Sequence, residues 1–156
     1  MVRWQDIESR DPAFADDVKR AFGAYKHKVL ATIKPDGSPR VSGVEATFNG
    51  GELWLGMMGQ SRKTHDLLRD PRMALHSATC DKSMTHGDAK ISGEAHEVVD
   101  PESWKLVVPD ANPPPDSHLF RVEISSVVLT RIGDPADHLD IDLWTVENGL
   151  RRMERA

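Results

Sequence analysis

Polar and apolar residues alternate along much of this chain, and short turn sequences separate the alternating segments. Segments with this period, rich in β-branched and aromatic residues, are typical of β-strands with one buried face. The pattern predicts seven strands, which cover residues 27–34, 39–48, 52–58, 72–80, 87–99, 118–133 and 139–149. PDGS at 35–38, NGG at 49–51 and the pair Asn148-Gly149 predict turns. We expect the strand at 118–133 to bend or bulge near Ser125 and Ser126.

Apolar residues recur at helical spacing in a few short segments. Asp11 and Pro12 have the residue types preferred at the start of a helix, and Phe14, Val18 and Phe22 follow on one face. A second helix is predicted from 61 to 70, where Pro71 stops it, and a third, short one at 101–108. Because these helices do not alternate with the strands, a doubly wound parallel sheet is disfavoured. An antiparallel barrel, whose closure removes exposed strand edges, is the predicted architecture.

Composition narrows the functional classes. The 156 residues suit a single domain over 1–156, and 38% apolar with 29% charged residues are typical of a globular protein. The net charge of −5 disfavours nucleic-acid binding. No apolar run is long enough for a membrane span, and the N-terminus lacks the apolar stretch of a signal peptide. Cys80 is alone, so no internal disulfide is expected, and a cytoplasmic location is predicted.

The clearest candidate chemistry lies where the helix at 61–70 begins. Ser61 is a preferred N-cap residue, and Arg62 and Lys63 follow it directly. A helix N-terminus favours anions, and an arginine and a lysine there add cationic ligands for a phosphate. Arg40 and Ser42 share one face of their strand and approach the same place if that strand pairs with 52–58. The alternative, in which Ser61 only caps the helix and the two cations are solvated, stays open on spacing alone.

Other candidate residues give weaker signals. His76 and Cys80 share one face of a predicted strand, but no H-x-x-x-H or C-x-x-C spacing accompanies them, so no metal site is predicted. His65 either reaches a ligand or is an exposed helix residue. Trp144 is either core or a pocket wall, whereas Trp54, Leu55, Met57 and Met58 are expected in the core. No nucleophile–base pair is recognisable.

The order of these elements resembles a known family. Residues 29–75, VLATIKPDGSPRVSGVEATFNGGELWLGMMGQSRKTHDLLRDPRMAL, are similar to the pyridoxamine 5′-phosphate oxidase-like family, the FMN-binding split barrels. The shared features are a PDGxP turn between strands, an apolar strand, and SRK opening a helix that ends in DPR. ISGEAHEV at 91–98 and LWTVENGLRRMER near the C-terminus extend the resemblance. It implies a mainly β protein with an antiparallel split β-barrel.

The resemblance also implies a homodimer with two cofactor sites at the subunit interface, holding FMN or, in some members, the deazaflavin F420. Arg62 and Lys63 match the family's phosphate ligands, with Ser61 beside them. The strand that passes the flavin is matched by Gly56, Met57 and Met58. The strand that faces the phosphate and the ring edge is matched by Arg40, Val41 and Ser42.

The chain departs from the family in three places. Asp66 stands where many members have Asn, the segment at 100–117 is short and proline-rich, and the C-terminal residues that bind pyridoxal phosphate in the true oxidases have no match. Pyridoxamine phosphate is therefore not the expected substrate. A small molecule with little charge fits better, lying against Met57, Met58 and, if it forms a pocket wall, Trp144.

Three functions remain open at this point. The expected one is an FMN-dependent oxidoreductase acting on a small organic molecule, in which the cofactor performs the electron transfer. An F420-dependent reductase is the alternative within enzymes. A non-catalytic split-barrel module that binds flavin weakly, or binds haem, is the alternative from another class.

Overall fold

Eight antiparallel strands form one sheet in the computed structural model, which describes residues 1–78, 81–110 and 112–156. Their bounds are β1 His27–Ile33, β2 Pro39–Asn49, β3 Glu52–Met58, β4 Arg72–His76, β5 Asp88–Glu97, β6 Ser117–Ile132, β7 Leu139–Thr145 and β8 Gly149–Arg155. The strand order is β3-β2-β1-β4-β5-β6-β7-β8, and β3 also pairs with β6. This pairing closes the first six strands into a barrel, so the predicted antiparallel split barrel is confirmed.

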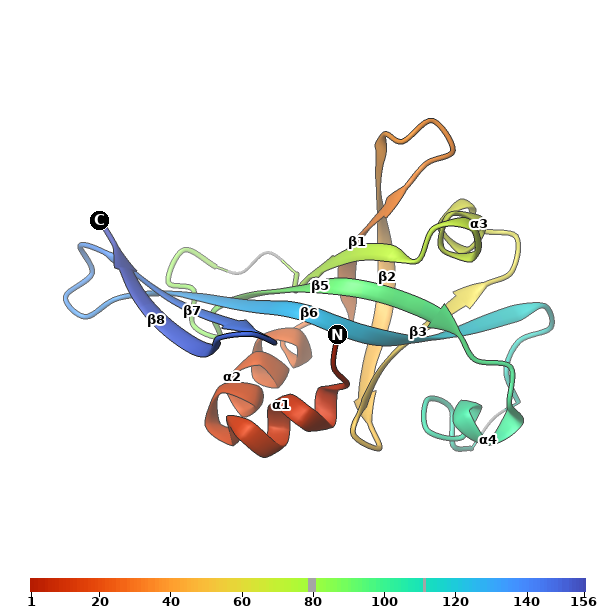
Figure 1. Ribbon diagram of the computed structural model, residues 1–156, viewed down its shortest axis with the longest axis horizontal. Coiled ribbons are helices and arrows are strands. Elements are labelled where there is room, and N and C mark those ends of the chain that lie inside the picture. Colours follow the sequence, from red (N-terminus) through yellow and green to blue (C-terminus); the bar gives the residue numbers. More distant parts are fainter. Residues whose placement is uncertain (79–80, 111) are drawn as a thin grey trace.

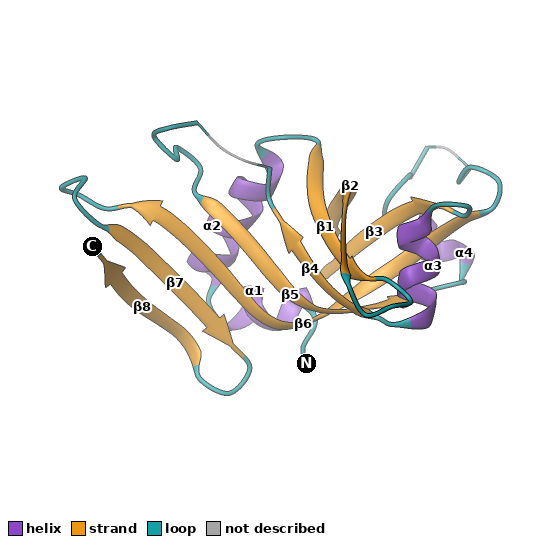
Figure 2. Ribbon diagram, turned by 90° about the horizontal axis from the view of Figure 1, so that it is seen from above, coloured by secondary structure: helices purple, strands orange, loops and turns teal. Residues whose placement is uncertain are grey.

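The last two strands continue the sheet beyond the barrel. β7 pairs with β6, and β8 pairs with β7 from Gly149 to Arg155 (Figures 1 and 2). The sequence predicted one strand over 139–149, but β7 ends at Thr145 and a turn leads into β8. β8 was missed because only Leu150 and Met153 are apolar in it, which is too few to show alternation.

Four helices accompany the sheet, with bounds α1 Trp4–Arg10, α2 Pro12–Gly23, α3 Arg62–Arg69 and α4 Pro101–Trp104. Phe14, Val18 and Phe22 of α2 are buried, as predicted. α1 was not predicted, because its seven residues bury only Trp4 and Ile7. α1 and α2 lie together on the opposite side of the sheet from α3 (Figure 1).

Aromatic rings join the N-terminal helices to the barrel. The Phe48 ring on β2 packs edge-on against Trp4 and Phe22, with centroids 4.6 and 5.6 Å away. Asp11 stands at the N-cap position of α2, yet its carboxylate accepts a hydrogen bond from Trp144 Nε1 at 3.0 Å and caps no backbone N–H. Trp144 is fully buried, which decides its role as core.

The middle of β6 contains the expected irregularity. Ser92 pairs with Ser126 and Gly93 pairs with Ile124, so Ser125 is an extra residue. Gly93 is required opposite this bulge, since a Cβ there would lie 1.9 Å from the Glu123 carbonyl oxygen. The strand predicted at 72–80 is present as β4, but it is shorter than predicted and ends at His76. Its last residues, Thr79 and Cys80, lie outside the described residues.

Candidate functional site

The start of α3 organises the site, and hydroxyl groups fix it in place. Ser61 is the N-cap, with its Oγ 3.4 Å from the Thr64 N–H that it caps and 2.7 Å from Thr64 Oγ1. Thr64 is fully buried and donates to the Met58 carbonyl at 2.9 Å. These bonds hold the first turn of α3 against the end of β3. The Ser61 hydroxyl is therefore engaged within the chain, as its capping role predicted.

Arg62 and Lys63, although adjacent in sequence, line two different hollows. Successive residues of a helix point about 100° apart, so their side chains do not face each other. Arg62 lines a hollow of about 550 Å³ between α3 and the β1–β2 turn, which we call the cationic cavity. Lys63 lines a hollow of about 440 Å³ over β2 and β3, which we call the apolar cleft.

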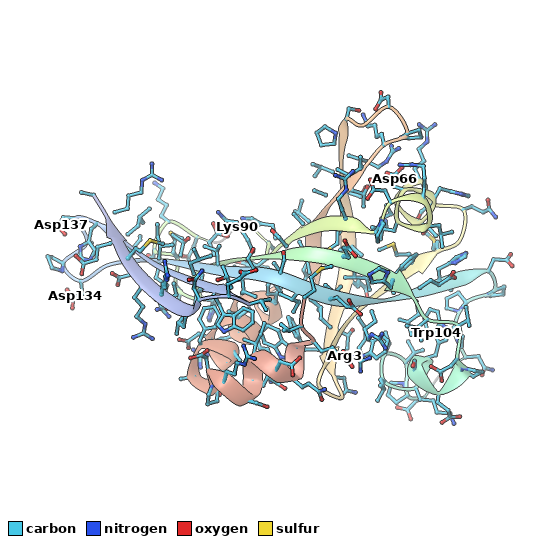
Figure 3. The ribbon with its side chains drawn as sticks, in the orientation of Figure 1. Arg3, Asp66, Lys90, Trp104, Asp134 and Asp137 are labelled. Carbon is cyan, nitrogen blue, oxygen red and sulfur yellow. The ribbon has the colours of Figure 1, made fainter. Side chains whose placement is uncertain are left out.

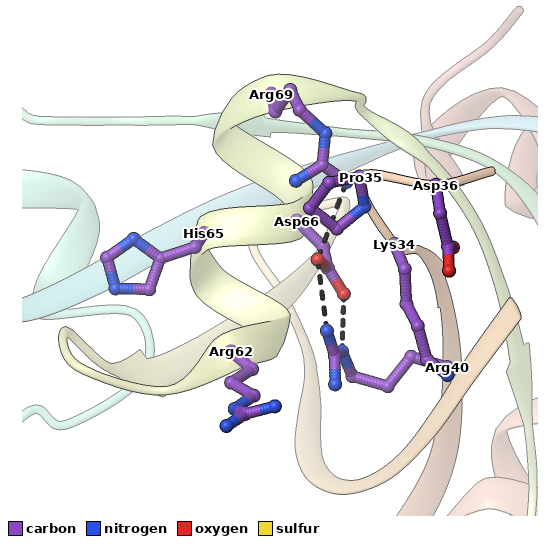
Figure 4. A pocket seen from close by; sticks show the side chains of 8 residues that line it. All are labelled: Lys34, Pro35, Asp36, Arg40, Arg62, His65, Asp66 and Arg69. Carbon is purple, nitrogen blue, oxygen red and sulfur yellow. Dashed lines mark hydrogen bonds and ion pairs between the residues drawn. The ribbon is translucent and has the colours of Figure 1, made fainter. Parts of the chain in front are cut away.

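The cationic cavity contains four basic side chains, Lys34, Arg40, Arg62 and Arg69, together with His65, Asp36 and Asp66 (Figure 4). Asp66 is 1% exposed and accepts hydrogen bonds from Arg40 Nε at 2.6 Å and Thr32 Oγ1 at 2.8 Å. Burial opposes ionisation of this carboxyl, but the bonds from Arg40 and Thr32 outweigh it, and the pKa of Asp66 is lowered. The same contact raises the pKa of Arg40.

Two of the four cations have side chains that can still bond to a ligand. In the part of the chain that the structure describes, the side chains of Lys34 and Arg62 make no hydrogen bond or ion pair with other residues. The Asp36 carboxylate, which lowers the cavity's positive charge, accepts bonds from Ser38 instead. The cavity therefore has an excess of positive charge and donors, which suits an anion such as a phosphate.

The apolar cleft has a floor of strand residues and a wall from the segment after β5. Gly43, Gly56, Met57 and Met58 line the floor side, and apolar residues line the other side: Trp104, Val107, Val108 and Pro114. Lys63 Nζ donates to the Gly43 carbonyl at 3.0 Å. Glu45, at the edge of the cleft, pairs with Lys26 at 3.2 Å.

The bare backbone of the floor is its most informative feature. Gly43 and Gly56 lie inside strands and have no positive φ that would demand glycine. A Cβ on Gly43 would meet nothing within 4 Å, and one on Gly56 would meet only the Trp104 ring, at 3.9 Å. Since glycine within a strand weakens it by about 0.5–1 kcal/mol relative to alanine, two such positions in one cleft indicate close approach of a ligand.

The structure divides the residues predicted for the site between the two hollows. Arg40 and Arg62 meet in the cationic cavity, and Lys63 lies in the apolar cleft with Gly56, Met57 and Met58. Val41 is 70% exposed on the outer face of β2, and Ser42 lies on the opposite face. Met58 is 73% exposed, so its assignment to the core was wrong, whereas Trp54, Leu55 and Met57 are buried as expected.

Several lining residues were missed from the sequence. Arg69 follows Arg62 by seven residues, which is two turns of the same helix face, and this spacing was a usable signal. Lys34 precedes the PDGS turn and Trp104 lies in a proline-rich segment, and neither position carried a pattern. His65 lines the cationic cavity.

A metal site and a membrane span were also considered from the sequence. The pairing of His76 with Cys80 cannot be described, because Cys80 lies outside the described residues. Among the residues that are described, one group of metal-ligand types comes together: His138 just before β7, Asp140 on β7 and Glu154 on β8 offer atoms within 4.8 Å of one another. No described helix combines the length and apolar character needed to cross a lipid bilayer.

Comparison with known proteins places the chain in a family. The sequence profile of pyridoxamine 5′-phosphate oxidase matches residues 15–131, about three quarters of the chain. No curated protein matches it significantly. Among solved structures, a pyridoxamine 5′-phosphate oxidase-related, FMN-binding protein from Nostoc punctiforme is similar with a TM-score of 0.64 and 12% identity, over 94% of this chain and 96% of that one.

Two further structures share the fold. PhzG from Burkholderia lata, in complex with tetrahydrophenazine-1-carboxylic acid, is similar with a TM-score of 0.61 and 16% identity, over 96% of this chain and 90% of that one. An F420 reductase is similar with a TM-score of 0.55 and 20% identity, over 72% of this chain and 93% of that one. At these identities the structures support the fold alone, and the sequence profile decides the assignment. The chain belongs to the pyridoxamine 5′-phosphate oxidase family, in its split-barrel fold.

Proposed function

We propose that this protein is an FMN-binding oxidoreductase that acts on a small organic molecule. The observation that carries the proposal is the bare floor at Gly43 and Gly56, where a flat ring can lie directly against the backbone. Bound FMN would supply hydride or electron transfer, and the chain would bind, orient and shield it. The FMN-binding relative from Nostoc punctiforme supports this choice of cofactor.

The cationic cavity fits the phosphate end of such a cofactor. Arg62 and Lys34 are unpaired within the described chain, and Arg40 stands beside them, held by Asp66. Lys63 lines the apolar cleft, where its ammonium donates to the Gly43 carbonyl. We therefore assign the phosphate to the cavity, with Arg62 as its main ligand, and the flavin ring to the cleft.

F420 is the second candidate cofactor, and one observation favours it. The cations of the cavity extend from Arg62 to Arg69, which lie about 10 Å apart along the helix axis. This spread accommodates a ligand with more than one anionic group, and an F420 reductase shares the fold. A non-catalytic flavin or haem module is the third candidate.

Assembly of two chains would complete the site. Val29 and Val41 lie near each other on the outer face of β1 and β2 and are 38% and 70% exposed. Met58 adds a third exposed apolar side chain at the end of β3. We propose that a second copy covers this surface in a two-fold symmetric homodimer, with the cofactor sites at the interface.

We propose that the substrate is not pyridoxamine phosphate, because the described residues that line the cleft include no second cluster of cations for its phosphate. Another pair of adjacent cations, Arg151 and Arg152, lies in β8 at the far end of the sheet from α3 (Figure 1). Arg152 is paired with Asp142 at 3.2 Å, and Arg151 donates to Asn148 at 2.6 Å. A substrate with little charge suits the apolar cleft, where Trp104, rather than the buried Trp144, forms the aromatic wall.

The proposal is tested with purified protein, Gly43→Leu and a matched control. Mass analysis of any co-purifying ligand, followed by titration with FMN and with F420, identifies the cofactor. Gly43→Leu should abolish flavin binding by filling the floor. Gly23→Leu is the control, since Gly23 on α2 is equally open and lies outside both hollows. Equal FMN affinity for both variants contradicts the proposed ring position, and no binding of either cofactor by the wild type contradicts the function.

A further inference from the structure

The wall of the apolar cleft is fixed by the chain itself. α4 is capped by Asp100, whose carboxylate accepts from the N–H groups of Glu102 and Ser103 at 3.0 and 3.2 Å. The residues after it are tied to the β2–β3 turn, where Asn49 Nδ2 donates to the Leu106 carbonyl at 2.9 Å. The Leu106 side chain also packs over Gly50. Trp104 is thus positioned by contacts that involve no ligand.

The Trp104 ring separates two hollows. It lines the apolar cleft on one side, beside Gly56. On the other side it lines a hollow of about 560 Å³ with Val99, Pro101 and Lys105. Figure 3 shows Trp104 on the α4 side of the sheet, away from Asp66 and the cationic cavity. Val108 also lines both hollows, so Trp104, the larger of the two side chains, contributes most to the size of the cleft at this end.

The charges around the cleft limit what can lie against this wall. The wall residues Trp104, Val107 and Val108 are apolar. Of the charged groups at the cleft, Lys63 contacts the Gly43 carbonyl and Glu45 is paired with Lys26. An anionic group placed against the wall would lose hydration without gaining a partner among these residues, which is unfavourable.

We propose that Trp104 is the specificity-determining residue of the cleft and selects a flat ring without negative charge as the substrate. This inference rests on the proposed function, and it places the flavin ring over the Gly43 part of the floor and the substrate beside Gly56 and Trp104. The indole face offers a large rigid contact to a flat ring, and because that face is electronegative it offers no favourable contact to an anion. Removing the indole would join the cleft to the neighbouring hollow, so the site would lose its fit for a small ring.

The test uses the full chain and three probes of similar size: 2-naphthamide, which is flat and uncharged, 2-naphthoate, which is flat and anionic, and decahydro-2-naphthamide, which is uncharged and not flat. Equilibrium dialysis measures their affinity with and without FMN. We expect the wild type to bind 2-naphthamide about tenfold more tightly than either other probe. Trp104→Ala should lose about tenfold for 2-naphthamide, and Trp104→Phe should retain most of the affinity. Lys105→Ala, an exposed change on the same segment, is the control.

A fluorescence measurement on the wild type keeps the inference testable if Trp104→Ala does not fold. Trp4, Trp54 and Trp144 are buried, so iodide quenching reports on Trp104. Bound 2-naphthamide should protect it. Three results would overturn the assignment. The wild type could bind the three probes equally, Trp104→Ala could bind 2-naphthamide as tightly as the wild type does, or bound 2-naphthamide could leave the iodide quenching of Trp104 unchanged. FMN affinity, measured separately by flavin fluorescence, should stay within about twofold of wild type in all variants. Its absence in the wild type would contradict the proposed cofactor while leaving the Trp104 result readable.

Discussion

Replacing Arg62 and Lys63 one at a time separates the roles of the two hollows. If the phosphate of FMN lies in the cationic cavity, Arg62→Ala removes a direct ligand from it. Lys63→Ala removes a cation that the structure places in the apolar cleft, already bonded to the Gly43 carbonyl at 3.0 Å. The two changes remove the same charge from adjacent positions, so a difference between them reports where the phosphate lies.

The expected magnitudes follow from the contacts. A charge-assisted hydrogen bond contributes about 1.5–3 kcal/mol, so Arg62→Ala should weaken FMN binding about 10- to 100-fold. Lys63→Ala should weaken it by less than about tenfold, because the ammonium acts on the phosphate at longer range. Replacing both should cost several kcal/mol. Arg62→Ala should leave the free energy of unfolding within about 0.5 kcal/mol of wild type, since no described residue bonds to its side chain.

FMN affinity is measured by titration of flavin fluorescence at low salt, and unfolding is followed in urea for each variant. Arg10→Ala is the matched control, because Arg10 is an exposed arginine at the end of α1. If Arg62→Ala binds FMN as tightly as Arg10→Ala does, the phosphate assignment is wrong. If Lys63→Ala instead shows the larger loss, the phosphate lies on the cleft side of α3.

Two further predictions concern stability and assembly. Asp66→Asn should lower the free energy of unfolding by about 2–4 kcal/mol at pH 7, because the bonds from Arg40 and Thr32 lose their charged acceptor. Since the folded-state pKa of Asp66 is lowered, this difference should be present above about pH 4 and vanish as pH falls through the folded pKa; a pH-independent difference would contradict it. Light scattering at micromolar concentration should report about 35 kDa, twice the 17.4 kDa chain, and a monomer mass would refute the dimer.

Most strands of the barrel were predictable because short stretches of neighbouring residues identify them. The alternating segments, the PDGS and NGG turns and the bulge at Ser125 all depend on neighbours in sequence, and each was found. Closure of β3 on β6 pairs residues 59 to 67 positions apart, so the local patterns predicted a closed barrel but could not show which strands close it. α1 and β8 were missed because each has just two apolar residues that show its period.

The candidate site was predictable as a set of residues but not as an arrangement. The SRK sequence located the start of α3, yet it suggested that Arg62 and Lys63 act on one side. The rotation of the helix separates them into two hollows. Trp104 could not be found, since its role follows from the docking of the 100–117 segment on the β2–β3 turn through Leu106.

The Asp66 carboxylate determines which cation of the cavity attracts an anionic ligand most strongly. An acid beside a phosphate would repel it by several kcal/mol at short range if its charge were not compensated. Here the carboxylate is buried and bonded to Arg40 at 2.6 Å, so the two charges largely cancel for a ligand in the cavity. Arg40 then contributes geometry and donors more than net charge. Arg69 also pairs with Asp66, at 3.4 Å, and the Asp36 carboxylate lies close enough to Lys34 for the two charges to interact. Among the described residues of the cavity, Arg62 is therefore the cation whose charge is least compensated. For that reason Arg62, rather than the better-anchored Arg40, is the residue whose loss should cost the most affinity.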